Sequence, residues 1–140
     1  LHLSLRRQRQ MCIRDRSNDI QRYPSHLPYP FSRAIRVGGF LFLSGQVPMS
    51  AEGEVVHGDI RVQTEAALAR IGETLAECGA SFDQVVKSTV WLTDMQHFAG
   101  FNEVYQRHFK NGFPVRSTVS AQLALGVDVE IEVQAWVGEN

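Results

Sequence analysis

One arginine and two glutamates near the C-terminus have the residue types of a charged site. Arg116 follows Pro114, whose ring fixes φ at about −65°, and precedes small and β-branched residues, so its guanidinium is expected at the start of a strand. Glu130 and Glu132 alternate with valine and isoleucine, which is typical of a strand with one buried face. A short connection makes a hairpin the simplest arrangement. The arginine would then face an acid, either in a site or in a plain cross-strand salt bridge.

Two further polar residues lie at the borders of predicted elements. Asn102 is one step off the aromatic stripe of a predicted helix, so it is either a surface amide or a residue near the core boundary of a site. Ser44 ends an apolar strand, where a serine either forms a turn or lines a pocket. The five histidines lack metal-site spacings, and the sequence holds no CxxC, HExxH, GxSxG, P-loop or GxGxxG motif. We therefore expect no metal ion and no cofactor.

The composition indicates one globular domain and excludes two classes of partner. The 140 residues are 44% hydrophobic and 21% charged. Residues 1–16 hold five arginines and one aspartate, so the rest of the chain carries about −5, which argues against nucleic acid as a partner. No apolar stretch approaches the roughly 18 residues of a membrane span. Cys12 lies in the arginine-rich segment and Cys78 at the end of a predicted helix, so we expect no disulfide framework and a cytoplasmic location.

The chain divides into two N-terminal segments and one domain. Residues 1–16 contain MCIRDR, which resembles the peptide obtained when sequencing-adaptor DNA is translated, so we expect a non-native or disordered segment without a function. A disordered basic tail and an RNA-binding arm are the alternatives. Residues 17–30 hold three prolines, which favour an extended lead-in. Ordered structure is expected from near Phe31, so that 31–140 form a single domain.

Hydrophobic periodicity predicts an α+β domain. Two short strands flank Gly38-Gly39, and the second, FLFL, is apolar on both faces. An amphipathic helix is expected from Asp59 to Cys78, and an aromatic stripe marks a second helix over 98–109. A β-branched strand over 85–93 separates them. This order predicts a mixed sheet of five or six strands with two helices on one face, and an apolar uncovered face that other copies of the chain bury.

Three motifs occur together in an order and spacing that resemble those of one family. They are FLFLSGQVP at 40–48, FNEVYQRHF at 101–109, and FPVRSTV at 113–119 with VEIEVQA at 129–135. Together they resemble the Rid family, also called the YjgF/YER057c/UK114 family, of reactive imine and enamine deaminases. The resemblance covers the chain from Tyr29 onward. It implies a chorismate-mutase-like subunit of the bacillus type, assembled as a homotrimer with active sites in the clefts between subunits.

The resemblance also implies roles for individual residues. Arg116 occupies the position of the family arginine that binds the substrate carboxylate, a task that suits a planar guanidinium. The backbone N–H of Thr118 is expected to complete this clamp. Glu130 matches the glutamate that orients or activates the attacking water. The preceding loop is one residue shorter than usual, so Glu132, which shares its strand face, is the alternative. The other expected substrate-binding residues are Asn102, Ser44, Gly45 and Phe31, the last at the position of a family tyrosine.

The implied reaction is hydrolysis of 2-imino or enamine carboxylic acids to 2-keto acids and ammonia. It needs no cofactor, since the substrate is already an activated electrophile. Pyridoxal-phosphate enzymes are the implied source of such imines, which makes the role metabolite damage control. Three alternatives remain open. They are a specialised aminomuconate-type deaminase, for which Phe31 leaves room, a non-catalytic trimeric module that binds metabolites or proteins, and a ribonuclease, against which the acidic composition argues.

Overall fold

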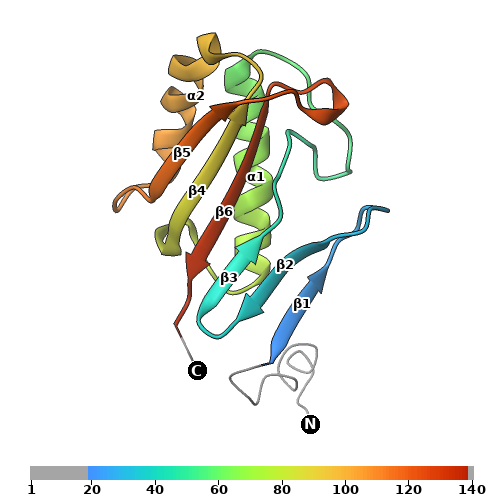
Figure 1. Ribbon diagram of the computed structural model, residues 1–140, viewed down its shortest axis with the longest axis vertical. Coiled ribbons are helices and arrows are strands. Elements are labelled where there is room, and N and C mark those ends of the chain that lie inside the picture. Colours follow the sequence, from blue (N-terminus) through green and yellow to red (C-terminus); the bar gives the residue numbers. More distant parts are fainter. Residues whose placement is uncertain (1–18, 139–140) are drawn as a thin grey trace.

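Six strands form one mixed sheet, and two helices cover one of its faces (Figure 1). The computed structural model describes residues 19–138, so the prediction for residues 1–16 lies outside the described residues. The strand order is β1-β2-β3-β6-β4-β5, and only β4 and β5 run parallel. The predicted α+β class and strand number are confirmed. The strands are β1 (Ile20–Pro24), β2 (Ser32–Val37), β3 (Phe40–Leu43), β4 (Val85–Leu92), β5 (Val115–Ser120) and β6 (Val129–Trp136).

The edge strand β1 extends the sheet into the segment expected to precede the ordered domain. It pairs antiparallel with β2, with Gln21 opposite Arg36, and the Gln21 side chain is buried. Pro24 stands at the end of this edge strand, where a missing N–H removes little from the ladder. The prediction that ordered structure begins near Phe31 is therefore wrong, since residues 20–24 form a paired strand within the expected lead-in.

Helix α1 (Ile60–Glu77) has the predicted capping residues at both ends. The Asp59 carboxylate accepts a hydrogen bond from the Val62 amide at 3.0 Å, and the chain leaves the helix through Gly79 at a φ of 77°. The apolar face of α1 is fully buried against the sheet, with no exposed surface at Leu68 or Leu75. No helix within residues 19–138 is long and apolar enough to cross a membrane.

Helix α2 (Phe98–Tyr105) is shorter than the predicted second helix, because 3₁₀ turns replace α-helix before it, at Met95–His97, and after it, at Gln106–His108. The aromatic stripe has the predicted core role. Phe101 and Tyr105 are buried, with ring centroids 5.2 Å apart, and Phe109 continues the stack at 4.7 Å from Tyr105. This stripe fixes α2 at the end of the sheet that carries β5.

The two C-terminal strands do not form the predicted hairpin. β4 lies between them, with Ser88 opposite Arg116 on the parallel side and Trp91 opposite Glu130 on the antiparallel side. The inward side chains of β4, such as Val90, are fully buried, and a strand of this kind is most stable when both of its edges are paired. The predicted cross-strand salt bridge between Arg116 and the glutamates is therefore wrong.

The sheet face away from the helices carries exposed apolar side chains. β3 is apolar on both faces, as predicted, with Leu41 and Leu43 buried and Phe40 and Phe42 well exposed. The Phe40 ring packs edge-on against Trp136 of β6, with centroids 4.9 Å apart. These rings lie on the face without helices. An exposed aromatic group of this size favours burial by another chain.

Candidate functional site

Arg116 is a half-buried cation without a carboxylate partner among residues 19–138. Its register opposite the buried Ser88 places it on the helix-covered face of the sheet. Its guanidinium makes no ion pair or side-chain hydrogen bond within that range, and lies over three rings of the aromatic stripe. The Cζ atom is 4.9 Å from the Tyr105 centroid, 5.4 Å from that of Phe101 and 5.6 Å from that of Phe98. Aromatic faces stabilise a cation without consuming its N–H donors, so Arg116 can still bind an anion.

The Tyr105 phenol beside Arg116 does not neutralise it. Burial raises the pKa of Tyr105 above its ordinary value, against smaller opposing effects of the Ser88 hydroxyl and the Arg116 charge. The phenol is therefore neutral at physiological pH. The positive charge of Arg116 stays uncompensated by the described side chains around it.

Two other predicted site residues carry buried, unpaired oxygens on the elements that hold Arg116. Asn102 follows Phe101 on α2, and Thr118 lies two residues beyond Arg116 on the same face of β5. The Asn102 Oδ1 and Thr118 Oγ1 atoms are buried and make no hydrogen bond with any described residue. Both oxygens are therefore available to accept a hydrogen bond from a bound molecule.

Glu130 belongs to a second location, on the open face of β6. Its carboxylate lines a cavity of about 550 Å³ together with Phe31 and Gly45. Burial raises the pKa of Glu130 above its usual range, and the nearby Glu132 charge raises it further. A half-buried carboxylate with a raised pKa holds a proton more readily than an exposed glutamate, which suits a group that takes up and returns a proton.

Gly45 lies directly against the Glu130 carboxylate. A Cβ built on Gly45 would occupy the place of the carboxylate oxygen, so a larger residue there would displace the Glu130 side chain from its present position. The following residue, Gln46, forms two backbone hydrogen bonds with Ile131, at 2.8 and 3.0 Å. These bonds hold the segment after β3 against β6 and fix the distance between Gly45 and Glu130.

Ser44 and Glu132 lie outside the cavity that Gly45 and Glu130 line. The Ser44 hydroxyl donates a hydrogen bond to the Ser32 carbonyl at 2.7 Å, so its side chain joins the ends of β2 and β3 and does not line the cavity. Its role in substrate binding stays a prediction. Glu132 shares the face of Glu130 but also lies outside the cavity lining, which favours Glu130 as the acid of the site.

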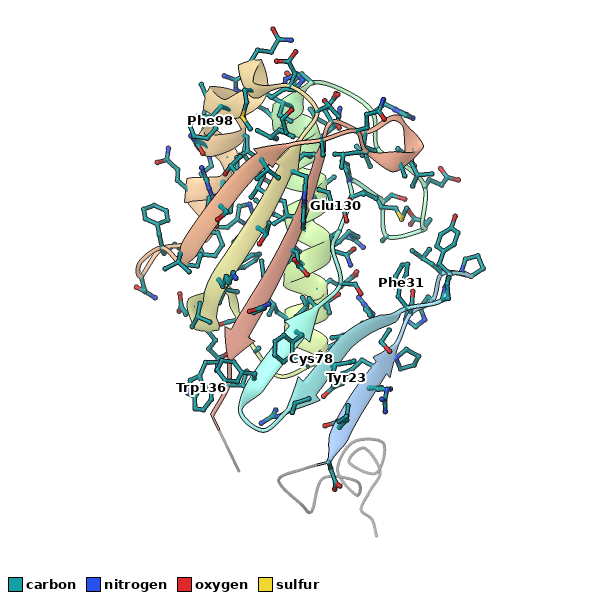
Figure 2. All side chains as sticks on the ribbon, viewed as in Figure 1. Tyr23, Phe31, Cys78, Phe98, Glu130 and Trp136 are labelled. Carbon is teal, nitrogen blue, oxygen red and sulfur yellow. The ribbon has the colours of Figure 1, made fainter. Side chains whose placement is uncertain are left out.

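The structure gathers the predicted site residues into two groups on opposite faces of the sheet. Arg116, Thr118 and Asn102 belong to β5 and α2 on the helix side. Glu130, Gly45 and Phe31 surround the cavity at the other side of β6. Figure 2 shows Phe98, over which Arg116 lies, beside α2, and Glu130 on β6, with the ribbons of β5 and β4 between them. One chain therefore does not bring the arginine and the glutamate to a common small molecule.

A charged cluster in the cavity wall was missed by the sequence analysis. Arg33 donates to the Thr74 hydroxyl at 2.8 Å and pairs with Glu77 at 2.6 Å, and Arg70 pairs with Glu73 at 2.7 Å. Arg33 and its partners are more than 40 residues apart along the chain. No local pattern in the sequence predicts a contact between residues so far apart. The two arginines near otherwise apolar positions are only a weak signal of such a charged cluster.

Replacing Glu132 by glutamine is expected to lower the pKa of Glu130. Removal of the neighbouring negative charge stabilises the ionised form of Glu130, whereas the larger effect of burial remains, so the value stays above that of an exposed glutamate. The carboxyl carbon shift of Glu130 in an NMR titration measures this. Glu103→Gln, on the exposed surface of α2, is the control and should leave the titration unchanged. An unaltered midpoint in Glu132→Gln would contradict the assigned cause.

Fold and site together define a class of protein, namely an α+β subunit with an unpaired guanidinium on one face of its sheet and a half-buried carboxylate on the other. Known proteins identify the family. The family model described as Endoribonuclease L-PSP matches residues 25–137. A RutC family protein of Pyrococcus abyssi is 46% identical over 107 residues, which are 76% of this chain and 84% of that protein.

A human protein and a solved structure extend the comparison. The human protein named 2-iminobutanoate/2-iminopropanoate deaminase is 38% identical over 111 residues, which are 78% of this chain and 81% of that protein. A crystal structure from Mycobacterium tuberculosis, described as a member of the YjgF/YER057c/UK114 family, matches with a TM-score of 0.74 and 30% identity, over 85% of this chain and all of that one. The chain belongs to the Rid (YjgF/YER057c/UK114) family, as its three motifs predicted.

Proposed function

We propose that this protein hydrolyses 2-imino acids and their enamine tautomers to 2-keto acids and ammonia. One observation carries the proposal, which is the half-buried Arg116 guanidinium that no described carboxylate neutralises. A cation kept unpaired in this way is suited to a carboxylate ligand. The relatives named 2-iminobutanoate/2-iminopropanoate deaminase support the reaction class.

Binding begins at the substrate carboxylate. Arg116 donates two parallel hydrogen bonds to the carboxylate oxygens, and the backbone N–H of Thr118 adds a third. The aromatic rings beneath the guanidinium restrict its motion, so the clamp is set before the substrate arrives. Asn102, with its buried unpaired oxygen, accepts a hydrogen bond from the imine nitrogen in this scheme.

Glu130 supplies the proton transfers. Its carboxylate accepts a proton from a water molecule as the water oxygen bonds to the imine carbon and the C=N pair moves to nitrogen. The same group then returns the proton to the nitrogen, which gives a tetrahedral amino alcohol. In the second step Glu130 moves the hydroxyl proton of this intermediate to its amino group as the C–N bond breaks, so ammonia leaves and the C=O bond forms. One water is consumed for each ammonia formed. The raised pKa of Glu130 suits both directions of transfer.

The two groups of site residues meet when copies of the chain assemble. Arg116 and Glu130 lie on opposite faces of one sheet, so a shared substrate needs Arg116 of one copy and Glu130 of the next. The exposed apolar rings on the open face favour such an assembly. We propose a homotrimer with three equivalent clefts, and a cytoplasmic location in keeping with the sequence.

An imine-generating enzyme provides the direct assay for the proposal. Threonine dehydratase releases the imine of 2-oxobutanoate, which hydrolyses slowly by itself. Added protein is expected to accelerate keto-acid release in proportion to its concentration, and a dialysed sample should act equally well because the scheme uses no cofactor. Absence of acceleration, together with calorimetric binding of 2-oxobutanoate, would show a binding module and sink the enzyme proposal.

A further inference from the structure

Leu125 has an unfavourable backbone conformation that the fold itself does not explain. Its φ of 67° and ψ of 15° lie in the left-handed region, and it is the one residue other than glycine with a positive φ within 19–138. A β-carbon makes this region unfavourable, and residues held in it concentrate at functional sites. The Leu125 side chain is also 49% exposed. Burial in the core therefore does not compensate for the strain.

The strained residue lies at the cavity that holds Glu130. Leu125 belongs to the 3₁₀ turn Ala124–Gly126, which precedes β6, and both Leu125 and Glu130 line the cavity. At about 550 Å³ the cavity is within the usual range for small-molecule sites and has room beyond the two or three carbons of a minimal imino acid. Its other large apolar lining residues are Leu27, Tyr29, Phe31, Val47 and Met49.

The charged residues of the cavity do not favour an acidic substrate tail. Arg70 and Arg33 in the wall already pair with glutamates, Arg70 with Glu73 at 2.7 Å and Arg33 with Glu77 at 2.6 Å. Glu130 adds a negative charge that repels an acidic tail. An apolar side chain on the imine carbon would instead displace water from apolar surface, which is favourable in proportion to the area buried.

We propose that Leu125 is a specificity-determining residue, which forms an apolar wall for the substrate side chain. It selects 2-imino acids with bulky aliphatic side chains over the 2-imino acid derived from alanine. This assignment rests on the proposed deaminase function, because it places the reacting carbon beside Glu130. The left-handed turn directs the Leu125 side chain to the cavity, and the strain persists because the site uses that direction.

Two variants at this position separate side-chain chemistry from backbone strain. Leu125→Gly removes both the side chain and the strain, whereas Leu125→Asn retains comparable size in a residue that tolerates the left-handed region but is polar. Val62→Ala is the matched control, since Val62 is apolar, 48% exposed and outside the cavity. An amino-acid oxidase supplies the imines of leucine and alanine, and calorimetry measures binding of the keto-acid products, 4-methyl-2-oxopentanoate and pyruvate.

The wild type is expected to prefer the leucine-derived imine by about tenfold in kcat/KM, and both Leu125 variants to lose at least fivefold of that preference. The binding ratio of the two keto acids should shift in the same direction, and Val62→Ala should keep both ratios. Leu125→Gly should unfold at or above the wild-type midpoint, since its strain is gone. The assignment would be overturned if the Leu125 variants lost the same factor of kcat/KM on the leucine- and alanine-derived imines, or if the binding ratio of the two keto acids stayed unchanged. If no imine is hydrolysed but the binding ratio shifts as expected, the deaminase proposal fails while the wall assignment stands.

Discussion

Replacing Arg116 by alanine is expected to lower kcat/KM for imine hydrolysis by about 30- to 4000-fold. Loss of one partner from a buried, hydrogen-bonded charge pair costs about 2–5 kcal/mol, and each 1.4 kcal/mol is tenfold. The effect should appear mainly in KM if the clamp holds substrate and transition state alike, and in kcat as well if it orients the imine carbon. Keto-acid release from the dehydratase-generated imine, followed over a range of imine concentrations, measures both.

The fold should tolerate this change, because Arg116 neutralises no acid in the described chain. Its contacts with the aromatic rings are worth about 1 kcal/mol, so thermal unfolding should shift by no more than about 4 °C. Arg116→Lys is the matched control. It keeps the charge but loses the bidentate geometry, and an intermediate activity is expected. Full activity in Arg116→Ala would show that the carboxylate binds elsewhere.

Replacing Glu130 by glutamine is expected to lower kcat by about 100- to 10 000-fold, the usual contribution of a positioned general base. Glutamine is nearly isosteric and keeps the packing against Gly45, so product binding should change little. Rapid-quench measurement of the single-turnover rate, with calorimetry of 2-oxobutanoate binding, separates the two effects. Glu132→Gln is the comparison within the same strand and should retain most activity.

The pH dependence follows from the same residue. Glu130 acts as a base only when ionised, and burial raises its pKa. Activity is therefore full above that pKa and is lost as the pH falls through it. This acidic limb should lie at higher pH than an exposed glutamate would give, and should be absent from the residual activity of Glu130→Gln. If the pH–activity profile of Glu132→Gln lacked the acidic limb, Glu132 would be the base.

Local patterns in the sequence predicted most of the helices and strands. The Asp59 and Gly79 caps, the two-faced FLFL strand and the aromatic stripe of α2 each depend on neighbours within one helical turn or one strand, and each is found in the structure. Arg116 and Glu130 were recognised from motifs of a few residues. The caps, the strand and the stripe follow from propensity and periodicity. The roles of Arg116 and Glu130 rest instead on the resemblance of their motifs to the Rid family.

Pairing between distant segments was not predictable in the same way. The alternation of β6 fits a hairpin with β5 and a pairing with β4 equally well. The pairing depends on the burial of β4, whose partners in β6 are as many as 50 residues away in sequence, as for Val85 and Ala135. The edge strand β1 was missed because the three prolines of residues 17–30 favour an extended lead-in and give no indication that part of it pairs with the sheet. Leu125 was missed because a positive φ at leucine has no sequence signal.

Coexpression of Arg116→Ala chains with Glu130→Gln chains tests the central claim most directly. If each cleft takes Arg116 from one copy and Glu130 from the next, a mixed assembly contains intact clefts although each parent is nearly inactive. A random equal mixture in a cyclic assembly should recover about a quarter of the wild-type activity. Activity of the mixed sample no greater than the average of the two parents would contradict a deaminase site shared between copies.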